Sequence, residues 1–308
     1  MSSIPAIKVQ NLSKKFNDHA AVDGISFTVE EGEFFGLLGP NGAGKTTTIR
    51  LITGVLKPDK GEILVRGLDM RTSSLQAKQR MGVIPEVGNV YPDLSAMENL
   101  DLVGKYYGLD KSTRRSRAEK LLEDLGLRDR KDDFLRKFSK GMRQRVSVAC
   151  ALIHQPPVLL LDEPTEGLDV MSRRLIIEKV KEMNKEGTSV LLTTHNIEEA
   201  NRLCQRVCII NKGKIAAIDT PEKLKKTMEK SQTIELAFDR NVEPSVFLCH
   251  CIHKAETCGD KCKLWVGDLD QALDHIMEIK KREGFRILNL ETCGPTLEDV
   301  FVKLCEVR

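Results

Sequence analysis

The sequence predicts an α/β fold with a largely parallel core sheet, a helical insertion and a small α+β domain at the C-terminal end. Short apolar runs alternate with helical patterns through most of the 308 residues, which is typical of strand–helix units in a parallel sheet. Residues 88–150 hold almost only helical patterns, so we expect a helical insertion there. The pattern changes again after Thr220 and Pro221. We therefore expect one domain over residues 1–225 and an accessory domain over residues 226–308.

The core strands are expected where short, continuous apolar runs occur, because strands buried on both faces lack polar alternation. They are Phe34 to Leu38, Val158 to Leu161 and Ser189 to Thr193. Helices are expected from about Lys45 and over 170–186 and 196–203 in the core, and over 96–107, 113–126 and 141–154 in the insertion. In the accessory domain we expect strands over 232–238, 263–267 and 285–291, and helices over 269–284 and 296–305.

Composition restricts the class of protein. Charged residues make up 30% of the chain and hydrophobic residues 41%, as in folded globular proteins. The net charge of +3 is too small to favour a nucleic-acid partner. The apolar runs are far shorter than the roughly 20 residues of a membrane-spanning helix, and the N-terminal segment lacks the apolar core of a signal peptide. We expect a cytosolic chain whose nine cysteines are mostly reduced thiols.

A glycine-rich loop after the first core strand fits the pattern G-x-x-x-x-G-K-[ST]. Its glycines let successive backbone N–H groups point at phosphate oxygens, and the helix that follows adds the positive end of its dipole. The lysine of this pattern reaches the β- and γ-phosphates and the hydroxyl that follows it binds Mg²⁺. The candidate nucleotide-binding residues are Gly39, Pro40, Asn41, Gly42, Ala43, Gly44, Lys45, Thr46 and Thr47.

Two adjacent carboxylates, Asp162 and Glu163, follow the second core strand. Ligands of α/β sheets bind at the carboxyl ends of the strands. Asp162 suits a Mg²⁺ partner, and Glu163 suits a general base that polarises the attacking water. An Asp-Glu pair alone would indicate no more than a solvated turn. With the glycine-rich loop it predicts that a nucleoside triphosphate is bound and hydrolysed, as in ATPases, GTPases, kinases and motor proteins.

The segment FSKGMRQR, Phe138 to Arg145, narrows that class. It resembles the signature motif of the ATP-binding cassette (ABC) family, in an S-K-G-M variant rather than the commoner S-G-G-Q. Ser139 and Gly141 offer a hydroxyl and an N–H group at a helix N-terminus. In the family this second phosphate grip acts on the nucleotide held by a partner subunit. The alternative from the residues alone is a surface helix with Ser as its N-cap.

Further family motifs follow in order. Glu166 to Asp169 matches the loop that couples the two sites of the dimer, and His195 matches the switch histidine that contacts the γ-phosphate. Phe16 matches the aromatic residue that stacks on adenine. The resemblance covers residues 4–225 and implies a P-loop core of ABC type. One departure is Glu86, which stands where the family usually has Gln. It keeps an oxygen ligand for Mg²⁺ but adds charge.

The chain resembles the ABC-2-type exporter subfamily, which includes drug-resistance ATPases. The resemblance rests on the signature variant, on Glu86 and on the tail Gly294 to Phe301. The resemblance implies an ATPase subunit that binds ATP and Mg²⁺, forms a homodimer and drives a separate ABC-2-type membrane permease. It implies a peripheral position on the cytoplasmic face of the cell membrane, without a nucleic-acid partner. The family's groove beside Glu86 receives a permease helix, and we expect Tyr91 and Leu94 at that docking surface; the alternative is that both belong to the local core of the insertion.

Two other functions remain open at this stage. One is a soluble ABC-type ATPase that acts on ribosomes or DNA, although such proteins usually carry two cassettes or long insertions. The other is a nucleotide-binding regulator without turnover, which Glu163 disfavours. The transported substrate cannot be read from this chain, because the permease selects it.

A cluster in the accessory domain lies outside the family pattern. It contains Cys249-His250-Cys251-x-His253, followed by Cys258 and Cys262. Thiolates and imidazoles are preferred ligands of Zn²⁺ and Cu(I). Cys249, Cys251, Cys258 and Cys262 are therefore candidate Zn or Cu ligands. The alternatives are a loop with free thiols and a redox-sensitive group.

Overall fold

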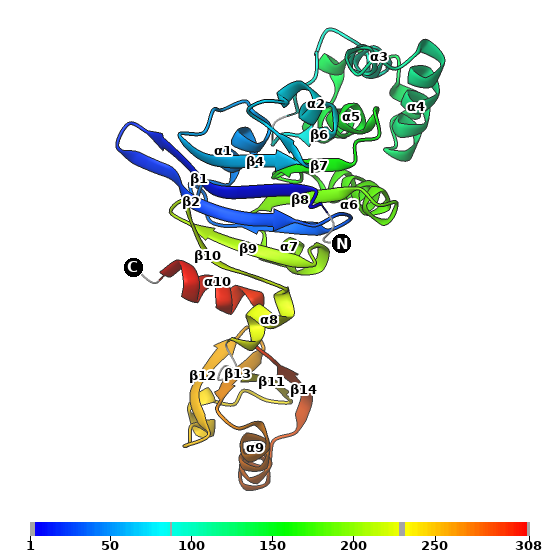
Figure 1. Ribbon diagram of the computed structural model, residues 1–308. Coiled ribbons are helices and arrows are strands. Elements are labelled where there is room, and N and C mark those ends of the chain that lie inside the picture. Colours follow the sequence, from blue (N-terminus) through cyan, green and yellow to red (C-terminus); the bar gives the residue numbers. More distant parts are fainter. Residues whose placement is uncertain (1–3, 87, 228–231, 307–308) are drawn as a thin grey trace. The chain divides into compact units, whose positions relative to one another are not determined.

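The computed structural model describes residues 4–86, 88–227 and 232–306 (Figure 1). The chain divides into two compact units, Met1–Ile218 and Asp219–Arg308. The division lies before the expected boundary at 225/226, because helix α8 (Pro221–Lys226) packs against α10 (Leu297–Glu306) within the second unit. No helix in the described ranges has the length and apolar character needed to cross a membrane.

The first unit is built around a six-stranded sheet in the order β10-β9-β3-β8-β7-β6. Four of its strand pairs, β9–β3, β3–β8, β8–β7 and β7–β6, are parallel. Every residue of β3, β7 and β8 is buried, which is why these strands read as continuous apolar runs. The predicted α/β class is confirmed. The bounds are β3 Phe34–Leu38, β6 Met81–Ile84, β7 Val158–Asp162, β8 Ser189–Thr194, β9 Arg206–Asn211 and β10 Lys214–Asp219.

A second, antiparallel sheet in the order β2-β1-β4-β5 packs with helix α1 (Lys45–Ile52) and the six-stranded sheet. Ile7, Ile49 and Leu160, from the three layers, belong to one buried apolar cluster, so a continuous core holds α1 in place. The bounds are β1 Ile7–Phe16, β2 His19–Val29, β4 Lys60–Val65 and β5 Leu68–Asp69.

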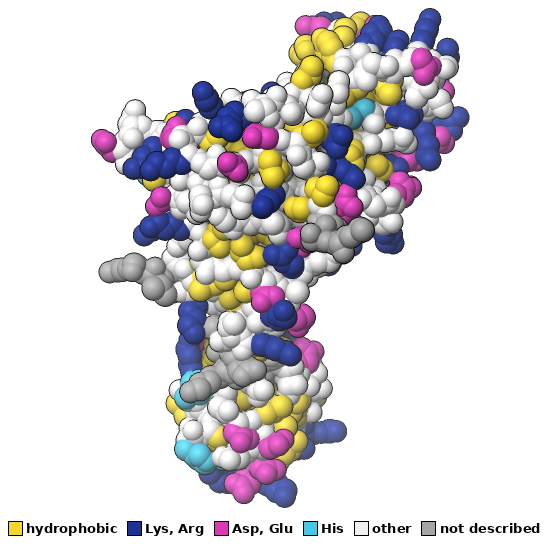
Figure 2. All heavy atoms as spheres, in the orientation of Figure 1, with side chains coloured by type: hydrophobic (Ala, Val, Ile, Leu, Met, Phe, Trp, Pro, Cys, Tyr) yellow, Lys and Arg dark blue, Asp and Glu magenta, His cyan; other side chains and the backbone are white. Residues whose placement is uncertain are grey.

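The helical insertion leaves the sheet after β6 and returns at β7 (Figure 1). Ser95 and Glu98 form a capping box that begins α3, which satisfies backbone N–H groups at the helix start. The chain then forms α4 and α5, and α5 is buried from Val146 to Leu152. Figure 2 shows Lys and Arg side chains gathered over this region, where α4 is strongly polar. The bounds of the insertion's helices are α3 Ala96–Tyr106, α4 Lys111–Asp124, η1 Arg128–Arg130, η2 Leu135–Lys137 and α5 Lys140–Leu152, and α2 (Ser74–Gln79) precedes β6. Helices α6 (Val170–Lys185) and α7 (Ile197–Leu203) follow β7 and β8.

The second unit has a four-stranded sheet in the order β12-β13-β11-β14, with paired strands antiparallel. Its core joins Leu236 and Leu264 of the sheet to Phe247 and to Ile276 of α9. Helix α9 ends at Gly284, whose φ of 69° is the left-handed conformation favoured at helix C-termini. The bounds are β11 Gln232–Phe238, η3 Pro244–Phe247, β12 Ile252–Cys258, β13 Lys261–Val266, α9 Leu269–Glu283 and β14 Ile287–Cys293.

Candidate functional site

The glycine-rich loop connects β3 to α1 and has no room for side chains at two positions. A Cβ atom on Gly39 would lie 2.5 Å from the carbonyl oxygen of Ile210, and one on Gly44 would lie 2.3 Å from that of Ala21. Gly44 also has a φ of 107°, a conformation that L-residues rarely adopt. No side chain caps the start of α1, so the first N–H groups of this helix are available to an anion.

The Lys45 side chain lies on the inner side of the glycine-rich loop and contacts its backbone. Its ammonium group donates hydrogen bonds to the carbonyl oxygens of Gly39 (2.7 Å) and Pro40 (3.1 Å). It also forms an ion pair with Glu163 at 3.1 Å. The Lys45 side chain is only 4% exposed, so its charge is directed into the loop.

Thr46 and Asp162 come together at the start of α1 and the end of β7. The Thr46 hydroxyl donates to Oδ1 of Asp162 at 3.1 Å. Oδ1 also accepts a 2.7 Å hydrogen bond from the hydroxyl of Thr193. Sequence reasoning missed Thr193, because only the parallel register of β7 and β8 places it opposite Asp162.

Glu163 has a backbone conformation that is unfavourable for a non-glycine residue, with a φ of 47°. Its N–H group is held by the carbonyl oxygen (3.1 Å) and the hydroxyl (3.2 Å) of Thr193. Such strain costs roughly 1–3 kcal/mol and persists where surrounding contacts impose it, often at functional sites. Its carboxylate lies 2.6 Å from Nδ1 of His195, whose Nε2 lies 3.4 Å from Glu166. The turn therefore places the carboxylate between a cation and an imidazole.

These groups surround one cavity of about 350 Å³. It is lined by Ala21, Asn41, Gly42, Gly44, Lys45, Thr46, Thr47, Glu86, Glu163, Glu166 and His195. The structure thus brings together most of the predicted phosphate, base and metal residues. Phe16 does not line this cavity: it is 45% exposed at the end of β1, with the Lys14 ammonium 5.8 Å from its ring centre. Ala21 also lines the cavity; it was not predicted, since tertiary packing alone brings it beside the loop.

The signature segment forms a separate feature. Ser139 is the N-cap of α5 and accepts a hydrogen bond from the N–H of Met142 at 3.2 Å. A Cβ on Gly141 would lie 2.4 Å from the hydroxyl of Ser172 and 2.7 Å from the carboxylate of Asp169, so only glycine fits there. Asp169 caps α6 by accepting from Ser172, and this backbone hydrogen bond holds its pKa below the ordinary value. Ser139 and Gly141 are not among the residues that line the cavity.

The ABC transporter family model matches residues 22–166. The Nod factor export ATP-binding protein I of Ralstonia nicotianae is 38% identical over 307 residues, which is 99% of this chain and 95% of that protein. The chain belongs to the ABC transporter ATP-binding subunits. The linearmycin resistance ATP-binding protein LnrL of Bacillus subtilis is 36% identical over 306 residues, covering 97% of both chains.

Two solved structures agree with this ABC assignment. An ATP-binding subunit of an ABC transporter shares 32% identity at a TM-score of 0.68, over 72% of this chain and 93% of that one. A dimeric ATP-binding cassette, bound to ADP and Pi after hydrolysis, shares 27% identity at a TM-score of 0.64, over 70% and 98%. The predicted exporter-type ATP-binding subunit, with ATPase activity, is confirmed, and a ribosome- or DNA-directed ATPase is not favoured.

The ABC subunit has a second, larger cavity of about 620 Å³ between the core and the helical insertion. Glu86 lines both cavities, so this groove begins at the nucleotide site. Tyr91 and Leu94, expected at the groove, do not line it, although Tyr91 is 52% exposed. The lining consists of Thr46, Ile49, Arg50, Thr53, Val55, Lys78, Met81, Val83, Pro85, Glu86, Asn89, Val103, Tyr107, Ser147, Cys150, Ala151 and Asp162.

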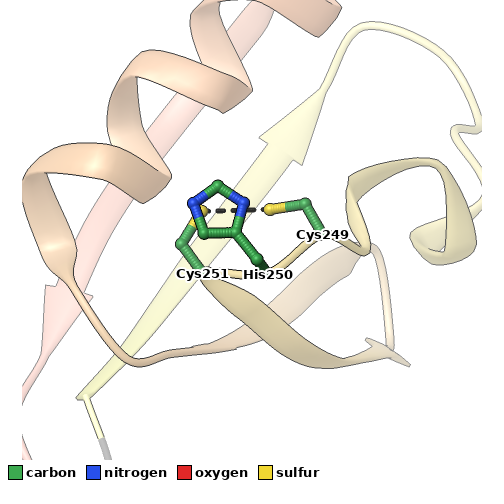
Figure 3. A group of neighbouring side chains, drawn as sticks. All are labelled: Cys249, His250 and Cys251. Carbon is green, nitrogen blue, oxygen red and sulfur yellow. Dashed lines mark hydrogen bonds between the residues drawn. The ribbon is translucent and has the colours of Figure 1, made fainter.

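The structure does not bring the four candidate metal-ligating cysteines of this ABC subunit together. Cys249 and Cys251 lie with His250 immediately before β12 (Figure 3), whereas Cys258 ends that strand. The register pairs Thr257 with Cys262, so both of the later cysteines belong to the far end of the β12–β13 hairpin. A strand advances about 3.3 Å per residue, which separates the two groups. The single four-cysteine site expected from spacing is therefore wrong.

Proposed function

We propose that this chain is the Mg²⁺-dependent ATPase subunit of an exporter, working as a homodimer on the cytoplasmic face of the membrane with a separate ABC-2-type permease. The observation that carries the proposal is the convergence of Lys45, Thr46, Glu163 and His195 on one cavity, with Asp162 hydrogen-bonded to Thr46 at its edge. These residues lie at the start of α1, at the end of β7 and directly after β8, and they have the chemistry that phosphate transfer to water requires.

The oxygen atoms beside α1 suit a magnesium ion. The Thr46 hydroxyl and the Asp162 carboxylate lie 3.1 Å apart, and Mg²⁺ prefers such oxygen ligands alongside substrate phosphates. When bound, the ion would neutralise charge on the phosphate oxygens. Thr193 would hold the Asp162 carboxylate in position, and Glu86 would offer a further oxygen at the rim of the cavity.

The protein's own residues account for the remaining chemistry. The N–H groups of the loop and the Lys45 ammonium would hold the phosphates, at the place where Lys45 now contacts backbone carbonyls. Glu163 would accept a proton from the attacking water, and the 2.6 Å contact with Nδ1 of His195 would orient it. The γ-phosphate would contact His195 in turn.

Dimerisation is supported by the position of the signature segment. Ser139 and Gly141 stand at a helix start outside the cavity of their own chain, where a second copy could supply them to the nucleotide. The groove that begins at Glu86 is the proposed place for the permease, since its apolar residues Val55, Val83 and Val103 offer contacts to an incoming helix.

The test uses purified chain and membranes that contain its permease. Glu163→Gln keeps the size of the side chain but removes the base, so turnover should fall by about 10²–10⁴-fold while ATP still binds. Lys45→Ala should instead weaken ATP binding itself. Turnover at the parent rate in Glu163→Gln contradicts the assigned role. Failure of the chain to co-purify with any membrane protein contradicts the permease partner without affecting the ATPase assignment.

A further inference from the structure

A compact group of thiols and an imidazole stands at the start of β12 in the second unit. Sγ of Cys249 lies 3.0 Å from Sγ of Cys251, and one ligand atom from each of Cys249, His250 and Cys251 lies within 4.8 Å of the others (Figure 3). The nucleotide-binding site uses none of these residues.

The backbone holds this group in place. Cys249 and Ile252 exchange two hydrogen bonds, from N–H to carbonyl, of 3.1 and 3.2 Å, so residues 249–252 form a closed turn. The carbonyl oxygen of Cys251 accepts a 2.9 Å hydrogen bond from Gly267. Cys251 is only 4% exposed and belongs to the core of the unit, with Cys249 packed against that core. Both thiols are thus positioned by the fold rather than by a flexible loop.

The imidazole is oriented by two residues at the start of α9. Asp268 accepts hydrogen bonds from the backbone N–H (3.1 Å) and the side-chain amide (3.4 Å) of Gln271. The amide oxygen of Gln271 therefore faces Nε2 of His250, at 3.2 Å. This carbonyl selects the tautomer with the proton on Nε2 and leaves a lone pair on Nδ1. Metal-binding histidines are oriented in this way by an outer partner on the second nitrogen.

The donor set decides which ion fits. Thiolate and imidazole ligands favour Cu(I) and Zn²⁺ over harder ions. Zinc in structural sites takes four protein ligands, but no fourth Cys, His, Asp or Glu joins this group within the ranges that the structure describes. Cu(I), a soft ion of single charge, is satisfied by two sulfur atoms and one nitrogen. We propose that Cys249, His250 and Cys251 form a Cu(I)-binding site, oriented by Gln271.

The site would join three parts of the small unit. Cys249 follows η3, Cys251 lies in the core beside β13, and His250 reaches α9 through Gln271. A bound metal adds stability to a small domain whose core is limited, so Cu(I) should raise the thermal stability of this unit. Its three residues differ from those proposed for ATP hydrolysis, so ATP turnover is a separate readout.

The experiment titrates the full, reduced chain with Cu(I) buffered by bicinchoninate in the absence of oxygen. The proposal predicts one Cu(I) per chain, with sulfur and nitrogen ligands by X-ray absorption. Cys249→Ser should weaken binding by more than the roughly 10–100-fold expected for Gln271→Ala, the outer partner. Cys258→Ser is the matched control, since Cys258 is exposed at the far end of β12, and should bind Cu(I) as the parent does.

Four results would overturn the copper site. The first is a reduced chain that retains no Cu(I) in competition with the buffer. The second is equal loss of binding in Cys249→Ser and Cys258→Ser, which would indicate nonspecific thiol capture. The third is stoichiometric Zn²⁺ that Cu(I) does not displace. The fourth is a disulfide between Cys249 and Cys251 that re-forms at once and prevents Cu(I) binding, which would indicate a redox pair instead of a metal site.

Discussion

Thr193→Val tests a contact that only the folded structure reveals. Valine has nearly the same shape as threonine but lacks the hydroxyl, which is fully buried and donates to Asp162 at 2.7 Å. The same hydroxyl accepts from the N–H of Glu163 at 3.2 Å. The substitution therefore removes one hydrogen bond from the carboxylate of the proposed Mg²⁺ site and one from the strained turn that carries the proposed base.

The expected loss of stability follows from the charge of the acceptor. A hydrogen bond to a charged group contributes about 1.5–3 kcal/mol, against about 0.5–1.5 kcal/mol for a neutral pair. We expect the free energy of unfolding of Thr193→Val to fall by about 2 kcal/mol. Thr188→Val is the matched control, because the Thr188 hydroxyl is also buried but donates only to the carbonyl oxygen of Pro156, at 3.4 Å.

The functional readout is the Mg²⁺ concentration that gives half-maximal ATPase activity. Loss of an outer partner typically costs 10–100-fold in metal affinity, so Thr193→Val should need roughly 10–100-fold more Mg²⁺. Thr188→Val should need the same concentration as the parent. Equal Mg²⁺ requirements in the two variants, with both folded by urea titration, would refute the positioning role of Thr193.

Two further predictions concern stability. Gly284→Ala places a side chain at the left-handed residue that ends α9 and should lower the free energy of unfolding of the second unit by about 1–2 kcal/mol in urea titration. Gly267→Ala is the control and should cost less, because a Cβ at that position meets open space. Equal losses in the two variants would contradict the role of Gly284 as a helix cap. Burial lowers the pKa of His154 from 6.5 to about 4, so the unfolded state binds more protons between these values. The free energy of unfolding should therefore decrease as the pH is lowered through that window, by up to about 3 kcal/mol. His154→Gln should lose this part of the pH dependence. An unchanged slope in that variant would contradict the role of His154.

The fold was predictable where burial is continuous. Strands β3, β7 and β8 are buried at every residue, so their apolar runs identified them. The antiparallel sheet of β1, β2, β4 and β5 was not predicted. β1 has three register shifts in its pairing with β2, and such bulges break the regular alternation that identifies a strand. β12 was also missed, because most of its residues are exposed and it reads as a polar loop.

The nucleotide site was predictable where its residues are contiguous. The loop from Gly39 to Thr46 contains glycines, such as Gly39 and Gly44, at positions where a side chain would not fit. Asp162 and Glu163 stand at the carboxyl end of a buried strand. Thr193 and Ala21 enter the site only because strands distant in sequence lie side by side. The cysteine prediction failed for a related reason: spacing along the chain cannot show that a hairpin moves Cys258 and Cys262 away from Cys249 and Cys251.

Two copies of this chain are proposed to close around shared ATP, and the mass of the Glu163→Gln variant in the presence of ATP shows whether they do. We expect a dimer of twice 34.6 kDa that holds two ATP molecules and separates into monomers when ATP is removed. Adding Ser139→Glu should prevent the dimer, because a carboxylate would repel the partner's nucleotide. A Glu163→Gln chain that binds one ATP yet stays monomeric at all concentrations would contradict the shared-site dimer.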